Sequence, residues 1–411
     1  MKPIFRLLLP LAGILIAHEA SAGIPVVSNV TAVQRVGTKL VDITYNVADS
    51  DGDTLKIRVE ISDNAGTLYS VPAFSFTGAV GDTITPGNNK TIVWDAGVDW
   101  DGEYSDQMKV KVIATDAKGF PGLEWGNEVP PGGFLMGQDG GAEGSGASRH
   151  VNIPWSYWMS KFEIRNDQYC EFLNVALAAG RVSRNGTTTS VKAVGGHWAG
   201  VAAATELIQI GDSEDIRWNV NNFEVVGGKV NFPVTVTWYG AIAFALQYGY
   251  DLPTDAEWEK AARGPDHDDQ DEHWVYPWGN SITGGHANYN GSGDPYDYIG
   301  LSKTPVGYYN GNQTPFGPNT KNTFGLYDII GNVSEWTRSV TTSLETYNQV
   351  ESLSATYHGY TNTGFRVTRG GSLRSSSGEL TLTNAYRGSA DRAIYNSYYP
   401  TGFRVARRST P

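Results

Sequence analysis

The sequence predicts two units of different fold class, an all-β sandwich followed by an irregular α+β domain. Three observations point to this division. Residues 24–116 alternate apolar and polar side chains in short runs between turn residues. Residues 117–131 are rich in glycine and proline, which indicates a linker. Residues 132–408 combine a few short helices with long Gly-, Asn-, Ser- and Tyr-rich stretches, unlike an alternating βαβ pattern.

The first 22 residues predict an export signal. Lys2 and Arg6 precede an apolar run, and Ala20, Ser21 and Ala22 form a typical cleavage site. The apolar run is short for a membrane span, although an uncleaved anchor remains the alternative. No other stretch predicts a transmembrane segment. We therefore expect a secreted, periplasmic or cell-surface protein.

The first domain is expected to be an immunoglobulin- or fibronectin-like sandwich. Segments 40–47 and 55–61 place apolar side chains at every second position, as strands with one buried face do. The clustered carboxylates Asp49, Asp51 and Asp53 would suit calcium. However, Thr54 stands where a calcium-binding loop needs glycine, so the pattern favours a hairpin turn.

Charge and cysteine content exclude two kinds of protein. The net charge of -12 argues against nucleic-acid binding, which requires a basic face. The single cysteine, Cys170, rules out an intrachain disulfide. Cys170 lies in a predicted helix that begins near Asn166, and free cysteines are among the most buried residues. We expect a buried, inert thiol.

The most specific motif of the second domain is the segment 252–264. Thr254 and Glu257 have the spacing of a capping box, in which each side chain bonds the other residue's backbone N–H. Trp258 and Ala261 then share one helical face, and Gly264 is suited to end the helix. The segment therefore predicts a short, capped helix.

This motif and eight further segments resemble the formylglycine-generating enzyme family, also called sulfatase-modifying factors. In the order of the family, the segments are 133–137, 161–166, 233–238, 276–279, 324–328, 331–336, 369–372 and 402–404. The resemblance covers the whole second domain apart from its inserts. It implies a C-type-lectin-like fold for residues 132–408.

The resemblance fails where the chemistry of the family takes place. Family members oxidise a substrate cysteine with Cu(I), which two cysteines just after a Gly-Gly-Ser motif hold through soft thiolates. Here those positions fall at Ser375 and near Leu380, next to Ser372. A hydroxyl is a poor ligand for Cu(I), and leucine has no ligand atom. We expect neither copper binding nor the family's oxidation.

The resemblance also implies structural calcium, held by oxygen ligands. One site would combine two carboxylates with two backbone carbonyls, from Asp328, Glu335, Gly331 and Val333. A second site, whose spacing departs from the family, would use side chains of Asn288 and Asp297 and carbonyls of Tyr289 and Ile299. The alternative is that these polar groups only cap loops.

We expect a non-catalytic module that binds an extracellular peptide, protein or glycan where the family holds its substrate. The stretch 372–399 is rich in residues that give adaptable hydrogen bonds and rigid aromatic contacts. Its candidate groove residues are Ser372, Arg374, Ser375, Tyr386, Arg387, Tyr395 and Tyr398. An ordinary polar loop surface is the alternative.

Two other functions stay open. One is a formylglycine-generating or related oxidoreductase that acts on sulfatase cysteines through a different ligand set. The other is a hypervariable lectin-like binding protein, because related folds diversify residues before a terminal Gly-Phe-Arg motif such as 402–404.

Overall fold

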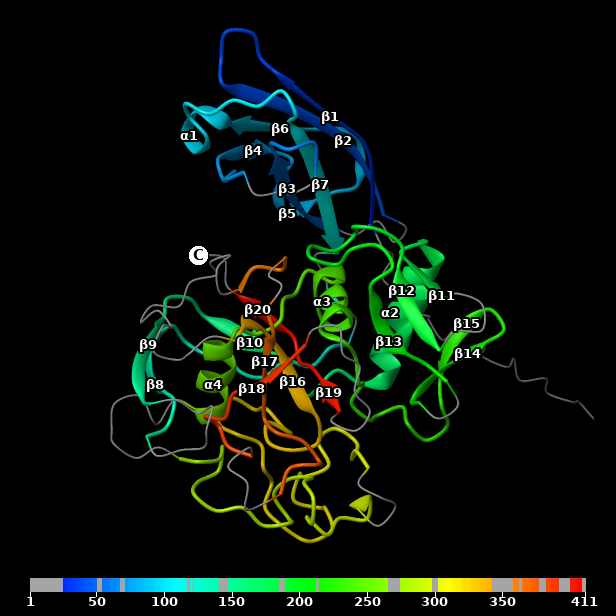
Figure 1. Ribbon diagram of the computed structural model, residues 1–411, viewed down its shortest axis with the longest axis vertical. Helices are drawn as coiled ribbons and strands as arrows, with labels where there is room; N and C mark the ends of the chain where they lie inside the picture. Colours follow the sequence, from blue (N-terminus) through cyan, green and yellow to red (C-terminus); the bar gives the residue numbers. More distant parts are fainter. Residues whose placement is uncertain are drawn as a thin grey trace, which may run out of the picture.

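The computed structural model describes residues 25–49, 54–66, 71–116, 119–120, 122–139, 147–184, 189–211, 214–264, 274–297, 302–341, 358–361, 364–376, 382–391 and 400–408. Figure 1 shows a small β-rich lobe above a larger part that contains α2, α3 and α4. The predicted export signal and the turn carboxylates Asp51 and Asp53 lie outside the described residues.

The N-terminal lobe consists of two antiparallel sheets. In strand order, the first contains β1 (Val26–Gln34), β2 (Leu40–Ala48), β6 (Gly87–Asp95) and β4 (Phe76–Gly78). The second contains β5 (Gly81–Ile84), β3 (Leu55–Ser62) and β7 (Lys109–Asp116). Inward residues such as Ile43, Ile57 and Trp94 form one buried core between the sheets. The lobe is β-rich as predicted, and its immunoglobulin-like character stays a prediction.

One helical turn, α1 (Ala96–Asp99), follows β6 in this lobe. The Asp99 carboxylate accepts hydrogen bonds from the Phe74 and Ser75 backbone N–H groups, each at 2.7 Å. It also accepts from the Trp94 indole N–H at 2.9 Å. These bonds join β6 to the segment before β4, so Asp99 fixes one end of the lobe.

The larger part has three helices among the described residues, α2 (Asn166–Ala178), α3 (Trp238–Gln247) and α4 (Asp255–Arg263). Its central sheet has the order β18 (Gly388–Ala390), β17 (Arg366–Arg369), β16 (Ser334–Val340) and β19 (Thr401–Gly402). Smaller sheets are β8 (Gly132–Met136) with β9 (Arg149–Ile153), β10 (Tyr157–Met159) with β20 (Ala406–Arg408), and β14 (Ile216–Asn219) with β15 (Asn222–Val225). A further sheet joins β11 (Val182–Arg184), β12 (Ser190–Ala193) and β13 (Glu206–Gln209). This is the predicted irregular α+β pattern.

Two hydrophobic cores flank the central sheet. The first surrounds α2 and α3 and includes Phe172, Trp238 and Phe244. The second surrounds α4 and includes Met136 and Trp258. Both helices α3 and α4 are therefore buried, which sets the chemistry available to their polar residues.

The segment predicted as a linker packs against the larger part. The Phe120 side chain is buried, and its ring lies 5.0 Å from the Tyr248 ring and 5.6 Å from the Phe244 ring. Its backbone N–H donates to the Tyr250 hydroxyl at 2.8 Å. Val129 forms a β-bridge with Tyr157. The chain thus enters the larger part within a few residues of β7.

Within the described part of the chain, every helix is too short or too polar to cross a membrane.

Candidate functional site

The predicted capped helix is α4, and its capping box is confirmed. The Thr254 hydroxyl accepts the Glu257 N–H at 3.1 Å, and the Thr254 N–H donates to the Glu257 carboxylate at 2.8 Å. Gly264 follows the helix with φ of +88°, a backbone conformation that favours glycine. All nine residues of α4 are buried. Each of its charged side chains therefore requires a partner.

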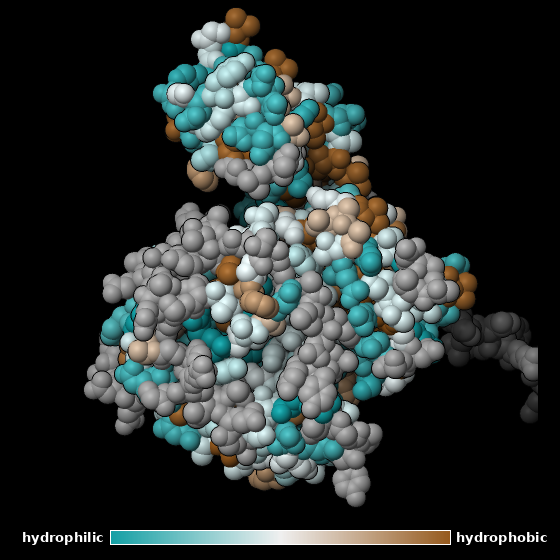
Figure 2. Space-filling view, viewed as in Figure 1, coloured by the Kyte–Doolittle hydropathy of each residue, from teal (hydrophilic) through white to brown (hydrophobic). Residues whose placement is uncertain are grey.

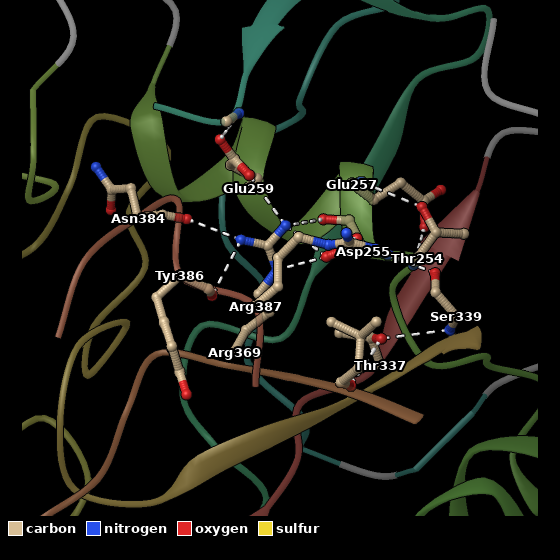
Figure 3. A network of polar contacts seen from close by, with 12 residues as sticks. Thr254, Asp255, Glu257, Glu259, Thr337, Ser339, Arg369, Asn384, Tyr386 and Arg387 are labelled. Atoms are coloured by element: carbon tan, nitrogen blue, oxygen red, sulfur yellow. Dashed lines mark hydrogen bonds and ion pairs between the residues drawn. The ribbon is translucent and has the colours of Figure 1, made fainter. Parts of the chain in front are cut away.

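Figure 3 shows two of those partners, Arg369 of β17 and Arg387 just before β18. Asp255 accepts from the Arg369 Nε at 2.5 Å and from the Arg387 Nε at 2.6 Å. Glu259 accepts from Arg369 at 2.9 Å and from Arg263 at 2.8 Å. Burial raises the pKa of Asp255, but the two guanidinium groups outweigh it and hold that pKa below its usual range. These ionised pairs brace the framework, and none is free to transfer a proton.

Ser372 and Ser375, the latter at the position expected for the family's first copper ligand, lie in a closed turn. The Ser375 N–H donates to the Ser372 carbonyl at 2.9 Å, and the Ser372 N–H donates to the Ser375 hydroxyl at 3.2 Å. The Asn290 N–H donates to the Ser375 carbonyl at 2.9 Å. Ser372 is 3% exposed. The turn presents hydroxyls without a thiolate, and the second position, Leu380, lies outside the described residues.

The single thiol, that of Cys170, lies in α2. Cys170 is buried, as predicted. Burial raises the pKa of its thiol to about 12, with help from the nearby Asp167, Glu224 and Glu171 charges. Because the thiolate is the nucleophile and the metal ligand, a thiol held neutral performs neither role at ordinary pH.

The predicted calcium site at Asp328 and Glu335 does not fit a cation in this structure. Arg404 Nε donates to both Glu335 carboxylate oxygens, at 2.9 and 2.8 Å, and its Nη2 donates at 2.6 Å. The Trp258 indole N–H donates at 2.7 Å. Each carboxylate oxygen thus accepts two hydrogen bonds, and the buried guanidinium already neutralises the charge. Of the two predicted carboxylates, only Asp328 would remain to join the predicted carbonyl ligands, Gly331 and Val333.

Two further carboxylates, those of Glu163 and Asp328, adjoin this ion pair. The sequence analysis did not identify Glu163 as a site residue. Asn332 donates to the buried Glu163 carboxylate at 2.8 Å. Burial, together with the Asp328 and Glu335 charges, raises the pKa of Glu163 well above its usual range. Burial also raises the pKa of Asp328 to about 6. Glu163 lies in segment 161–166, which resembles the family, and this resemblance could have identified it as a candidate site residue.

The other predicted calcium site does fit a hard cation. Asn288 Oδ1 and Asp297 Oδ1 are buried and have no hydrogen-bond partner. The remaining atoms of both side chains are engaged: Asn288 Nδ2 donates to the Ser302 carbonyl at 2.9 Å, and Asp297 Oδ2 accepts from Gly293 at 2.8 Å. Two orphaned buried oxygens are costly without a ligand, and both are of the type that calcium prefers. Of the two predicted carbonyl ligands, Tyr289 is described and Ile299 is not.

The predicted groove residues divide into two groups. The Arg387 side chain is 7% exposed, and its Nε is bound to Asp255, so Arg387 also supports α4. The Tyr386 carbonyl accepts from Arg369 in the same network. Arg374 and Ser375 are half-buried at the turn. Tyr395 and Tyr398 lie outside the described residues.

No other described residues form a recognisable catalytic centre. In the part of the chain that the structure describes, no three His, Cys, Asp or Glu side chains are placed to hold a metal ion. The Ser339 hydroxyl and His358 Nδ1 lie 3.0 Å apart, but both side chains are buried. The Ser339 hydroxyl also accepts the Asp255 N–H at 2.8 Å, which assigns the pair to the start of α4.

The larger part is thus a scaffold in which buried ion pairs hold α4. A model of the sulfatase-modifying factor enzyme 1-like domain matches residues 127–409. The chain belongs to this family.

The chain is also similar to several individual proteins. The chain is 31% identical over 235 residues to the inactive C-alpha-formylglycine-generating enzyme 2 of Mus musculus, covering 51% of this chain and 67% of that protein. It is 28% identical over 233 residues to the formylglycine-generating enzyme of Mus musculus, covering 51% of this chain and 56% of that enzyme. A solved structure of Treponema denticola variable protein 1 is 17% identical, with a TM-score of 0.41, over 68% of this chain and 94% of that chain.

Proposed function

We propose that this chain is an exported, non-catalytic member of the sulfatase-modifying factor family that binds an extracellular peptide, protein or glycan. The observation that carries the proposal is the cysteine content. The chain has one cysteine, and that thiol is buried in α2. The family chemistry needs two thiolates on one Cu(I), so a single neutral thiol cannot reproduce it.

The proposal is also supported by a contrast between the buried ion pairs of α4, which are present, and the position expected for the copper ligand, which carries Ser375. The buried network of α4, which requires Asp255, Glu259 and Arg369 together, is complete. The copper position carries Ser375. A relative at 31% identity bears the name of an inactive formylglycine-generating enzyme. A family scaffold that keeps its framework and lacks its redox ligands is suited to binding without turnover.

We also propose one structural calcium ion, held by Asn288 and Asp297 with the carbonyls of Tyr289 and Ile299. The orphaned oxygens Asn288 Oδ1 and Asp297 Oδ1 support this assignment. Bound calcium would supply the charge that these oxygens lack and would brace the loop 288–297. Glu335 is omitted because Arg404 holds it.

The N-terminal lobe is proposed to be an immunoglobulin-like module, and the first 22 residues an export signal that is removed. Two packed antiparallel sheets with one core support the first inference. Such a lobe would hold the larger part away from a surface or from a neighbouring module.

An activity assay on the mature chain tests the proposal. The chain is loaded with Cu(I) and mixed with a sulfatase-derived peptide that contains the substrate cysteine. Oxygen uptake and peptide mass are then followed, with a formylglycine-generating enzyme as the positive control. The proposal expects an unchanged peptide and no oxygen uptake. Conversion of cysteine to formylglycine would overturn it and favour an oxidoreductase with a different ligand set.

A further inference from the structure

We propose that calcium bound by residues 288–297, the calcium loop, fixes the position of residues 370–376, the groove turn. Ligand binding at the predicted groove would then depend on calcium. This inference rests on the proposed function, because the groove turn contains Ser372, Arg374 and Ser375 of the predicted groove. It adds a regulation of that site, in which the ion acts through protein contacts and does not touch the ligand.

The calcium loop holds two carboxylates whose hydrogen-bond donors are neutral. Asp294 Oδ2 accepts from the Ser292 hydroxyl at 2.7 Å and from the Tyr309 hydroxyl at 2.9 Å. Asp297 Oδ2 accepts from the Gly293 N–H at 2.8 Å, and Asp297 Oδ1 is buried without a partner. Neutral donors do not cancel the repulsion between two like charges on one short loop. We therefore expect a bound cation to order the loop.

The calcium loop is accessible to solvent. Gly291, Gly293 and Pro295 are exposed. The loops around residue 300, yellow in Figure 1, form the lower end of the larger part, and Figure 2 shows mainly hydrophilic and intermediate surface with scattered hydrophobic atoms there. Calcium at this loop can thus exchange with the surrounding solution, as a regulatory ion must.

A first link to the groove turn starts at the residue that offers calcium its amide oxygen. The backbone carbonyl of Asn288 accepts the Asn332 N–H at 2.8 Å, and the Asn332 carbonyl accepts the Leu373 N–H at 2.9 Å. The Asn332 side chain is held on both sides, because Oδ1 accepts the Thr304 N–H at 3.0 Å and Nδ2 donates to Glu163 at 2.8 Å. A displacement of Asn288 is therefore passed to the groove turn through one firmly held residue.

Close packing at Gly331 keeps this link short. A Cβ atom at Gly331 would lie 2.3 Å from the Asn288 carbonyl oxygen, so only glycine lets the two segments approach this closely. The Gly331 N–H also donates to the Gly370 carbonyl at 2.9 Å, at the start of the groove turn. The calcium loop and the groove turn thus contact the same short segment from two sides.

A second link joins the calcium loop directly to the end of the groove turn. The Asn290 N–H donates to the Ser375 carbonyl at 2.9 Å, and Asn290 forms a parallel β-bridge with Ser376. The proposed carbonyl ligand, Tyr289, lies between the two links. Its oxygen accepts the Ser292 N–H at 2.9 Å and has a second lone pair for a cation. Calcium ligands therefore adjoin both points at which the loop holds the turn.

The groove turn has few residues with which to fix its own position. Its internal bonds join Ser372 and Ser375, which sets the shape of the turn, whereas the two links set where it lies. Arg374 and Ser375 are half-buried on this turn. An ordered calcium loop would hold these two side chains in place, and a loosened loop would release them.

Hydrogen exchange of the unmodified mature chain, in calcium and in chelator, tests this proposal. Calcium should slow exchange in residues 370–376 about fivefold or more, whereas exchange in α2, which carries none of the proposed ligands, should change little. Asp297→Asn should abolish the calcium effect on the groove turn. The matched control is Asp106→Asn, because Asp106 is an exposed aspartate of the N-terminal lobe and should leave the effect intact.

The possible failures are distinguishable. Absence of calcium uptake would overturn the calcium assignment and this inference together. Calcium uptake with unchanged exchange in the groove turn would overturn this inference alone, as would equal slowing in α2, which indicates general stabilisation. Formylglycine formation would overturn the non-catalytic function and leave the exchange result untouched. The comparison of calcium with chelator uses the unmodified chain, so it stays decisive if Asp297→Asn fails to fold.

Discussion

Replacement of Asp255 by alanine tests whether buried ion pairs hold the family scaffold together. Asp255 is the shared acceptor of Arg369, which is 0% exposed, and of Arg387, which is 7% exposed. Asp255→Ala removes the carboxylate and leaves both guanidinium groups buried. The nearby Glu259 retains its bond to Arg369 at 2.9 Å, so one of the two arginines keeps a charged partner.

The expected cost follows from that geometry. Removal of one partner from a buried pair costs about 3–5 kcal/mol, because the remaining charge is left uncompensated. For a unit of this size, each kcal/mol lowers the melting temperature by about 2 °C, so we expect a decrease of about 6–10 °C. The measurement is thermal unfolding of the mature chain, followed by tryptophan fluorescence.

A solvent-exposed pair supplies the control. Arg217 and Glu224 form an ion pair whose side chains are 46% and 29% exposed. Glu224→Ala should change the melting temperature little, because solvent screens this pair. Equal melting temperatures for Asp255→Ala and Glu224→Ala would show that the buried pairs stabilise the chain no more than the exposed pair does.

The pH dependence of the same variant provides a second check. Burial opposes ionisation of Asp255, but Arg369 and Arg387 keep its pKa below the ordinary value of about 3.9. The stabilisation is therefore present above that value and is lost as the pH falls through the lower folded pKa. The difference between the unmodified chain and Asp255→Ala should shrink in acid. A difference that grows below pH ~4 would contradict the sign.

Three further predictions concern single residues. Calorimetric titration of the chelator-treated chain should show that it binds one calcium ion. Calcium binding should be lost in Asp297→Asn and retained in Glu335→Gln. Binding of two ions, or loss of binding in Glu335→Gln, would contradict the assignment. Cys170→Ala should leave metal content and ligand binding unchanged, and the native thiol should react slowly with a disulfide reagent; rapid reaction would show that it is exposed. Burial opposes ionisation of Asp99, but its hydrogen bonds lower the pKa of this carboxyl to about 2. The stability that Asp99 contributes should therefore be lost as the pH falls from about 4 toward 2. An Asp99→Asn variant that unfolds in acid at the same pH as the unmodified chain would contradict this.

Local signals in the sequence predicted local structure well. The capping box of Thr254 and Glu257 depends on residues three apart, so the spacing alone specifies the geometry. The buried Cys170 followed from its place on an apolar helical stripe. The β-rich N-terminal lobe followed from strict alternation.

Partners that are distant in the sequence could not be predicted. Glu335 is bound by Arg404, 69 residues away, and nothing local indicates that a guanidinium would occupy the predicted calcium ligand. Arg387 was expected to face a ligand, but it reaches Asp255 across 132 residues. Phe120 lies in a Gly- and Pro-rich segment typical of a linker, yet tertiary packing buries it. The edge positions of β1 and β7 depend on strand order, which alternation does not encode.

Titration of the mature chain with Cu(I), in competition with a chromophoric chelator, shows whether the chain can hold the metal that the family's oxidation requires. The account predicts no stoichiometric uptake, because the only thiol is buried and protonated and Ser375 offers a hydroxyl. One Cu(I) bound per chain with a thiolate–copper absorption band would contradict it, since Cys170 would then be an accessible metal ligand.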